Sequence, residues 1–427
     1  MLVATQGMVK RKSQIGLPRW GPFRSVAVGP PSLYSRAVVF SSRADWDQTP
    51  NALARLRAEM LASGESFIDL TESNPTRCGF AYPDDLVLRA LSDPACLAYD
   101  PDPRGMRGAR AAVSRAFAGA LDPERIVLTA STSEAYSWLF KLLCEAGDEV
   151  LVPRPSYPLF DYLARLESVR LESYPLTYED RWRLDWDVLA QKVRPRTRAV
   201  IVVHPNNPTG SYLDEKEIAG LREVCRAHGL TIISDEVFFG YPLVESARAP
   251  SSLFGISDVL TFCLGGLSKM AGLPQMKLAW IAVNGPVAER RKALQRLELI
   301  GDTYLSVGTP VQTGVERLLE AGETLRPQIL HRVRGNLEFL ARSREPEAAW
   351  ECLRAEGGWS AVLRLPRIVS EQDWAITLLK QDRIYVHPGF FFDFPGEGYL
   401  VVSLLPPEGQ FCEGVGRLLQ RVRVMAG

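Results

Sequence analysis

The chain has 427 residues, and its 50 lysines and arginines balance its 50 aspartates and glutamates, so the formal net charge is zero. This length is enough for two or three packed units, and the charge balance gives no support for a nucleic-acid partner. No apolar run approaches the length of a membrane span. The seven scattered cysteines and four histidines argue against a disulfide framework and a metal centre. We therefore expect a cytoplasmic protein without a metal.

Residues 1–43 differ in composition from the rest of the chain. They include seven lysines and arginines, no acidic residue, and many Pro, Gly and Ser residues. An organelle transit peptide is one interpretation. We favour an extension that does not fold, because segments such as "GLPRWGPF" do not make an amphipathic helix.

Beyond this leader, short apolar runs alternate with helical patterns. The runs that predict strands buried on both faces cover residues 125–131, 148–154, 198–205, 230–236, 259–265 and 278–283. The helical patterns between them cover residues 133–147, 214–229 and 286–300. This alternation predicts an α/β domain with a mostly parallel sheet.

The rhythm changes after a long helical pattern around residues 312–342. Two later runs, 357–365 and 398–405, predict strands of a smaller α+β unit. We expect the segment before the large domain to pack with that unit. The predicted organisation is therefore a leader of residues 1–43, a large domain of residues 95–325, and a small domain formed by residues 44–94 and 326–427.

Two motifs rich in polar groups follow predicted strands, at the edge where open parallel sheets bind ligands. The first, "TASTSEAY", places Ser131, Thr132 and Ser133 at a helix N-terminus, where they suit either a helix cap or a phosphate group. The second, "HPNNPTG" at residues 204–210, contains turn residues and is compatible with a plain turn.

Two further motifs place charged groups at strand ends. "SDEVFFGY" ends a strand with Asp235 and Glu236, which suit a helix cap or a pair of metal ligands. "GGLSKMAG" places Lys269 directly after an apolar strand. A solvated surface lysine is hard to reconcile with that position.

In this order and at these intervals, "NNPTG", "SDEVF" and "LSKMAGLPQMKLAW" resemble the fold-type I pyridoxal-phosphate enzymes of the class I/II aminotransferase family. The resemblance covers roughly residues 45–425 and extends to "LTESNPTRCGF", "YDPDPRGMRGAR", "PRPSYPLF", "EGGWSAVLRLP" and "VHPGFFFDF". Each piece is weak alone, and the ordered combination is specific. The resemblance implies pyridoxal 5′-phosphate as cofactor, a seven-stranded, mostly parallel sheet in the large domain, and a homodimer.

The resemblance also implies two catalytic residues. Lys269 matches the lysine that forms a Schiff base with the cofactor aldehyde. That amine must lose its proton near neutral pH, which burial favours, and once displaced by the substrate it moves a proton at the substrate α-carbon. Asp235 matches the carboxylate that pairs with the pyridinium nitrogen and keeps the ring an electron sink.

A larger set of residues matches positions that bind the cofactor. This set comprises Ser131, Thr132, Ser133, Tyr157, Asn207, Asp235, Ser268, Lys269, Lys277 and Tyr99. By the resemblance, Asn207 binds the phenolic oxygen, Tyr157 stacks on the pyridine ring, and the three hydroxyl residues before the helix hold the phosphate. Tyr99 resembles the tyrosine that reaches across a dimer interface to the partner's phosphate.

The chain departs from the family pattern on the cofactor side. Lys277 stands where arginine is common, which keeps the charge and loses the bidentate geometry. Gly266 stands where many members have a phosphate-binding serine. Phe238 replaces a tyrosine that donates to the phenolic oxygen, and a phenyl ring cannot donate.

A third departure concerns the substrate carboxylate. Val401 stands at about the position of the arginine that usually binds this carboxylate. Asn74 matches a loop that lines the substrate side, so the nearby Arg77 is our candidate for the missing contact, ahead of Arg104 and Arg107. A plain surface arginine is the competing interpretation of Arg77.

The resulting functional prediction is an aminotransferase of the alanine/aspartate type. It moves an amino group between an amino acid and a 2-oxo acid, both small molecules, by a ping-pong mechanism, and we expect no nucleic-acid or membrane partner. The same scaffold also supports lyase, decarboxylase or racemase chemistry, an alternative that the missing arginine strengthens. A non-catalytic sensor is disfavoured, because Lys269 and Asp235 are both present.

Overall fold

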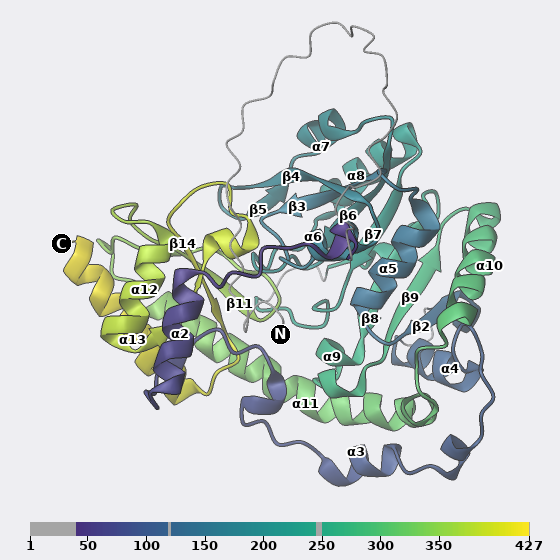
Figure 1. Cartoon of the computed structure of the whole chain (residues 1–427), viewed down its shortest axis with the longest axis horizontal. Helices are drawn as coiled ribbons and strands as arrows, with labels where there is room; N and C mark the ends of the chain where they lie inside the picture. The colour runs from purple at the N-terminus through teal and green to yellow at the C-terminus, as the bar shows by residue number, and fades with distance from the viewer. Residues whose placement is uncertain (1–39, 118–120, 245–249, 427) are drawn as a thin grey trace, which may run out of the picture.

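The computed structural model describes residues 40–117, 121–244 and 250–426 (Figure 1). An eight-stranded sheet in the order β2–β9–β8–β7–β6–β3–β4–β5 forms the centre of the large domain. Its strands are β2 (Ile126–Thr129), β3 (Glu149–Arg154), β4 (Arg170–Tyr178), β5 (Trp182–Leu184), β6 (Thr197–Val203), β7 (Thr231–Asp235), β8 (Thr261–Gly266) and β9 (Ala279–Asn284). Strands β8, β7, β6, β3 and β4 run parallel to one another, and β9 and β5 are antiparallel to their neighbours.

The predicted α/β sheet is confirmed, with one strand more than the seven expected. The six apolar runs became β2, β3, β6, β7, β8 and β9. The sequence reasoning missed β4 and β5 because β4 lies near the edge and is only partly buried, so it lacks a continuous apolar run. Side chains of the central strands alternate between two buried clusters, one on each face of the sheet.

Helices cover both faces of the large sheet and build most of the small domain. They are α2 (Ala52–Ala62), α3 (Asp84–Ala90), α4 (Arg107–Ala116), α5 (Thr132–Leu143), α6 (Phe160–Leu166), α7 (Trp186–Lys192), α8 (Glu215–His228), α9 (Leu267–Met270), α10 (Val287–Tyr304), α11 (Thr309–Arg342), α12 (Glu371–Asp382) and α13 (Glu408–Ala426). The boundaries predicted for α8 are confirmed by a capping box between Asp214 and Glu217 and by the left-handed Gly229 that ends the helix.

The small domain contains a four-stranded antiparallel sheet in the order β10–β11–β14–β13. These strands are β10 (Glu351–Cys352), β11 (Ser360–Arg364), β13 (His387–Pro388) and β14 (Tyr399–Ser403). A parallel pair, β1 (Ile68–Asp69) with β12 (Ile384–Tyr385), joins the N-terminal segment to the C-terminal part of the chain. Helix α11 runs beneath both domains (Figure 1), and the predicted boundary at residue 325 falls inside this continuous helix.

The predicted leader lies largely outside the described residues, which begin at residue 40. The first described residues dock on α6 of the large domain. Arg165 donates to the carbonyls of Ser42 and Asp45, both at 2.7 Å. Trp46 packs edge-on against Tyr162 with ring centroids 5.1 Å apart. The chain then crosses to α2, which packs against α12 in the small domain (Figure 1).

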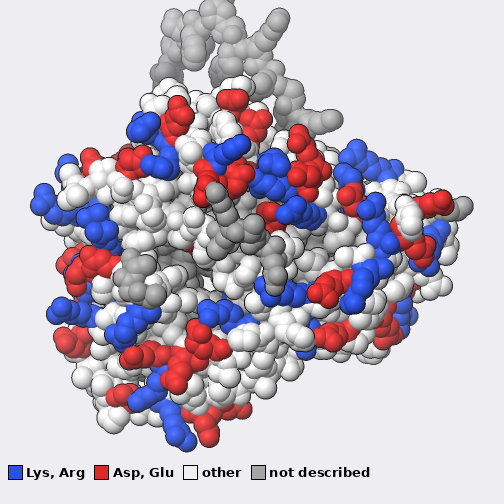
Figure 2. All heavy atoms as spheres, turned by 180° about the vertical axis from the view of Figure 1, so that it is seen from behind, with Lys and Arg blue, Asp and Glu red and all other residues white. Residues whose placement is uncertain are grey.

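The surface matches the balanced composition. Figure 2 shows acidic and basic side chains interspersed on the face in view, without a large area of one sign. Among the described helices, none is long and apolar enough to cross a membrane. Within the described residues there is also no group of three or more histidine, cysteine or acidic side chains placed to hold a metal ion.

A buried ion-pair network joins the β4–β5 edge to the start of α8. Arg181 donates to Asp214 at 2.6 Å and to Glu217 at 2.8 Å. The Glu217 side chain is almost fully buried, and its other oxygen accepts from the backbone N–H of Leu184 at 2.8 Å. The Glu217 carboxylate therefore depends on Arg181 for its countercharge.

We predict that Arg181→Ala lowers the free energy of unfolding by about 3–5 kcal/mol, because it leaves a buried carboxylate without its countercharge. Urea denaturation of the purified variant measures this. Arg183→Ala is the matched control: Arg183 pairs with Asp180 on the surface, so its loss should cost less than about 1 kcal/mol. Equal effects of the two substitutions would contradict the prediction.

Candidate active site

The carboxyl ends of β6, β7 and β8 bring three of the sequence motifs together. Asp235 is the last residue of β7, where it pairs in register with Val203 of β6 and Leu264 of β8. The turn of residues 204–210 follows β6, and Lys269 lies in α9, directly after β8. Because the three strands are adjacent and parallel, these segments share one edge of the sheet.

Asp235 is a buried carboxylate with few hydrogen-bond donors. Its Oδ2 accepts from the hydroxyl of Tyr136 at 3.0 Å, and its Oδ1 accepts from the backbone N–H of Val237 at 3.2 Å. Burial raises the pKa of Asp235 to about 6, although both hydrogen bonds and the nearby Lys269 oppose that rise. The site therefore leaves this carboxylate short of positive charge.

Lys269 has the properties of an amine that deprotonates easily. Burial lowers the pKa of Lys269 to about 8, and the Asp235 carboxylate partly opposes that effect. The ammonium nitrogen lies 5.0 Å from the ring centroid of Trp359 and 5.6 Å from that of Phe238. The hydroxyl of Tyr241 donates to the backbone carbonyl of Lys269 at 2.6 Å, which fixes the backbone that carries the amine.

Tyr136 is a site residue that the sequence reasoning missed. It lies in α5, four residues after Thr132, and is fully buried. Proximity to Asp235 adds to burial in raising the pKa of Tyr136 well above its ordinary value, so the phenol stays protonated and can donate to the carboxylate. Only a weak indication of this role is present in the sequence, because Tyr136 looks like an ordinary residue on the apolar face of the helix that begins at "TASTSEAY".

The N-terminus of α5 shows how the hydroxyl motif is used. Ser131 caps the helix, since its Oγ accepts from the backbone N–H of Glu134 at 3.1 Å. The Glu134 carboxylate in turn accepts from the N–H of Ala130 at 2.6 Å and from Ser306 Oγ at 2.7 Å. Thr132 and Ser133 are partly exposed in the first turn, where backbone N–H groups lack partners within the helix.

The turn after β6 is docked on the small domain. Gly210 adopts φ +72°, and a Cβ at this position would lie 2.6 Å from the carbonyl oxygen of Gly357. The Gly210 carbonyl accepts from the N–H groups of Glu356 at 3.0 Å and Gly357 at 2.8 Å. Glycine is therefore required at 210, and the turn that presents Asn207 is fixed against the segment leading to Trp359.

Glu236 is placed for a structural role. Its carboxylate accepts from Ser234 Oγ at 3.0 Å, from Ser252 Oγ at 2.6 Å, and from the backbone N–H of Leu253 at 2.9 Å. These bonds tie the end of β7 to the loop before β8. Of these two adjacent acids, Asp235 accepts fewer hydrogen bonds and is the one that can accept another.

A family model described as "Aminotransferase class I and II" matches residues 88–409, well over half of the chain. The chain belongs to this family. Curated relatives include the glutamate-pyruvate aminotransferase AlaA of Escherichia coli K12, 26% identical over 361 residues that cover 80% of this chain and 87% of that protein. Another is the alanine aminotransferase of Mycobacterium tuberculosis H37Rv, 26% identical over 386 residues that cover 86% of each chain.

Solved aminotransferases share the fold. An alanine aminotransferase from Pyrococcus furiosus superposes with a TM-score of 0.77 at 22% identity, covering 87% of this chain and 96% of that one. A Thermus thermophilus aspartate aminotransferase double mutant superposes with a TM-score of 0.76 at 20% identity, covering 89% and 99%. The chain thus has the fold of the fold-type I aminotransferases.

Four further residues of the predicted cofactor set are Tyr157, Ser268, Lys277 and Tyr99. Tyr157 is close enough that the Asp235 charge adds to burial in raising the pKa of Tyr157 to about 12. Ser268 immediately precedes Lys269 in α9. Lys277 is exposed and adopts φ +49°, and Tyr99 is 80% exposed.

The residues predicted for the substrate side are Asn74 and Arg77, which lie in and beside one short turn. Asn74 caps a short 3₁₀ turn, Pro75–Arg77, by accepting from the N–H and hydroxyl of Thr76. Arg77 is largely exposed, lies 3.9 Å from Glu72, and lines a surface hollow of about 550 Å³. None of the residues lining that hollow belongs to the predicted cofactor set. Val401 is buried in β14, where an aliphatic side chain cannot bind a carboxylate.

We predict that Asp235 makes the cofactor-free protein less stable as pH rises from about 4 to 6. The folded-state pKa of about 6 lies above the ordinary 3.8, so the folded form holds the proton more tightly and loses stability when that proton leaves. The two-unit difference corresponds to about 3 kcal/mol.

Asp235→Asn removes this titration. Its free energy of unfolding, relative to wild type, should therefore rise by up to about 3 kcal/mol between pH 4 and pH 7 in urea titrations. Asp180→Asn is the control, since a hydrogen bond from Arg183 lowers the pKa of that exposed carboxyl. A pH-independent difference between wild type and Asp235→Asn would contradict the prediction.

Proposed function

We propose that this aminotransferase uses pyridoxal 5′-phosphate to exchange an amino group between a small amino acid and a 2-oxo acid. The observation that carries the proposal is Lys269, an amine with a lowered pKa beside the buried, electron-rich Asp235 at the ends of adjacent strands. The names of the relatives make alanine and glutamate the first donors to test, with pyruvate as an acceptor.

The residues present fit such a cofactor. Asp235 lacks a permanent positive partner, and a protonated ring nitrogen would supply one. The first turn of α5 presents a helix N-terminus and the hydroxyls of Thr132 and Ser133, groups that suit a phosphate. We assign Tyr157 to the face of the ring, Asn207 to the phenolic oxygen, and the residues Ser131, Thr132, Ser133, Ser268 and Lys277 to the phosphate side.

When bound, pyridoxal phosphate supplies the electron sink that stabilises negative charge at the substrate α-carbon. Asp235 maintains the charge that makes the ring effective, and the Tyr136 hydroxyl orients this carboxylate. Lys269, with a pKa near 8, is placed to take the proton from the substrate α-carbon and to return a proton at the cofactor carbon C4′. Trp359 and Phe238 flank the amine and keep water from one side of it.

Because Val401 cannot bind a carboxylate, the substrate carboxylate needs a different partner in this enzyme. We keep Arg77, with Asn74, as the proposed substrate-side residues, because they follow the family's substrate loop in sequence. To serve, the Arg77 guanidinium must exchange its surface partner Glu72 for the substrate.

We further propose a cytoplasmic homodimer in which Tyr99 reaches the partner's phosphate site. The support is an exposed apolar segment, with Leu97 87% exposed and Tyr99 80% exposed beside a 50 Å³ hollow that the end of α10 also lines. Large apolar side chains gathered at one surface favour an interface.

Multi-angle light scattering should give twice the monomer mass of 47.5 kDa. Tyr99→Ala should weaken retention of the cofactor about tenfold, the factor expected for one lost hydrogen bond. Leu88→Ala, an exposed apolar position in α3, is the control. A fully active monomer would remove the dimer proposal.

Replacing the catalytic amine gives the sharpest test of the activity. Lys269→Ala should lose the visible absorption band of the cofactor–protein complex, and turnover should fall at least about 10³-fold, since the covalent step and proton transfer share this group. Lys292→Ala, on the exposed face of α10, should behave like wild type. Retained turnover in Lys269→Ala would refute the assignment.

The donor can be named spectroscopically. Amino acids are added singly to the holoenzyme, and conversion to a stable pyridoxamine-phosphate spectrum that a 2-oxo acid reverses would establish transamination. Release of ammonia, thiol or carbon dioxide without that conversion would instead show lyase or decarboxylase chemistry.

A further inference from the structure

Asn206 precedes Asn207 in the turn after β6 and is almost fully buried, with 4% of its surface exposed. Its Nδ2 donates to the backbone carbonyl of Pro155 at 3.1 Å and to Thr209 Oγ1 at 2.9 Å. Its backbone N–H donates to Ser211 at 2.9 Å, and its carbonyl accepts from Gly210 at 2.7 Å. Asn206 thus closes the turn and also holds it to a second loop.

That second loop leads to Tyr157. Pro155 lies two residues before Tyr157, and the intervening Ser156 donates its backbone N–H to the carbonyl of Phe392 at 2.9 Å. The side chain of Asn206 is therefore a direct link between the loop that presents Tyr157 and the turn that presents Asn207. The proposed function assigns these two residues to the face and the phenolic oxygen of the same ring.

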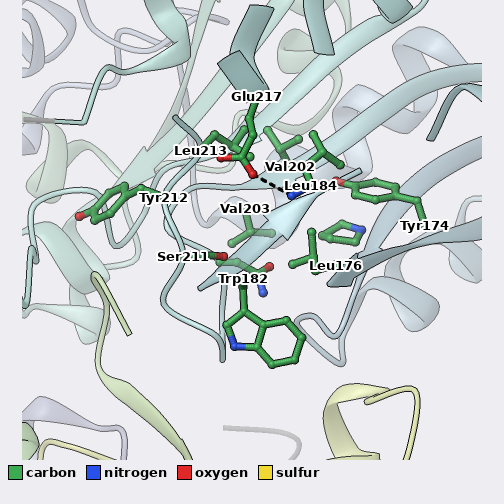
Figure 3. Close-up of a pocket in the computed structure, with 12 residues that line it drawn as sticks. Tyr174, Leu176, Trp182, Leu184, Val202, Val203, Ser211, Tyr212, Leu213 and Glu217 are labelled. Atoms are coloured by element: carbon green, nitrogen blue, oxygen red, sulfur yellow. Dashed lines mark hydrogen bonds between the residues drawn. The ribbon is translucent and has the colours of Figure 1, made fainter. Parts of the chain in front are cut away.

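Asn206 and Trp182 also line one cavity, which Figure 3 shows in close-up. Among the described residues, neither Asn206 Oδ1 nor Trp182 Nε1 has a hydrogen-bond partner, and both are buried. Both side chains line the same cavity, whose volume of about 10 Å³ is at the lower limit of the space that one water molecule needs. A buried donor and a buried acceptor are both costly to leave unpaired, and one water hydrogen-bonded to both atoms would remove that cost.

We propose that Asn206 is a positioning residue for the cofactor ring and that one ordered water, bound to Asn206 Oδ1 and Trp182 Nε1, completes its hydrogen bonds. The proposal rests on the proposed function, since the ring contacts belong to it. Asn206 itself touches no reacting atom. It sets the distance between Asn207 and Tyr157.

The test uses the holoenzyme of Asn206→Ala and follows the pH midpoint of the cofactor's visible band and the rate at which cofactor is lost. Displacing Asn207 removes a donor from the phenolic oxygen, so the midpoint should rise by about half a unit or more. The loss of cofactor should accelerate about tenfold, as for one lost hydrogen bond. Thr209→Val, which removes one of the two acceptors, should shift both quantities in the same direction by less.

Leu176→Ala is the matched control, because Leu176 lines the same cavity and has no polar group. It should lower the melting temperature and leave the midpoint of the band unchanged. An unchanged midpoint in both Asn206→Ala and Thr209→Val, with a normal band and transamination in wild type, overturns the positioning role while the proposed function stands. A wild type that forms no band overturns both.

A crystal structure of the wild-type protein tests the water independently of the cofactor. Density for one water within hydrogen-bond distance of Asn206 Oδ1 and Trp182 Nε1 is the expected result, and Trp182→Phe should lose it. An empty cavity in wild type would overturn the water's part in the proposal.

Discussion

The burial of one carboxylate organises this site. Placing Asp235 at the end of an interior strand removes it from water, and a phenol and one backbone N–H compensate only in part, so its pKa rises to about 6. The neighbouring amine of Lys269 is destabilised as a cation by the same burial, and its pKa falls to about 8. Each group is thus held near the point where it changes charge. Asp235 would hold a cationic ring nitrogen, which would supply the positive charge that the carboxylate lacks, and Lys269 would carry protons.

The fold and the positions of Asp235 and Lys269 at strand ends were predictable because their signals are local. A buried strand and the motif at its end occupy consecutive residues, so both can be recognised in the sequence, as "SDEVF" and "LSKMAG" show. Tyr136 was not predictable, since its hydrogen bond to Asp235 joins residues 99 positions apart. Strand β4 escaped detection because its partly exposed side chains break the apolar pattern, and β5 because it has only three residues. The link from Asn206 to Pro155 is equally non-local and depends on two loops meeting.

Two of the departures from the family pattern, Phe238 and Val401, replace polar groups with apolar ones. Phe238 and Trp359 pack against each other with ring centroids 5.2 Å apart and place aromatic faces toward the amine of Lys269. Val401 of β14 lies between Val362 of β11 and His387 of β13 in the small sheet. An aliphatic side chain thus occupies the position where the family pattern has an arginine. Phe238 thus removes a polar group from the predicted cofactor side, and Val401 removes a cation from the predicted substrate side.

The attachment of residues 41–46 to α6 sets a mechanical limit on the enzyme. The chain is anchored on the large domain at Trp46 and enters the small domain at Asn51, the cap of α2. Five peptide steps separate these two residues, a reach on the order of 18 Å when fully extended. The ring contact at Trp46 and the start of α2 at Asn51 therefore cannot separate by more than about 18 Å unless one of these two attachments is released.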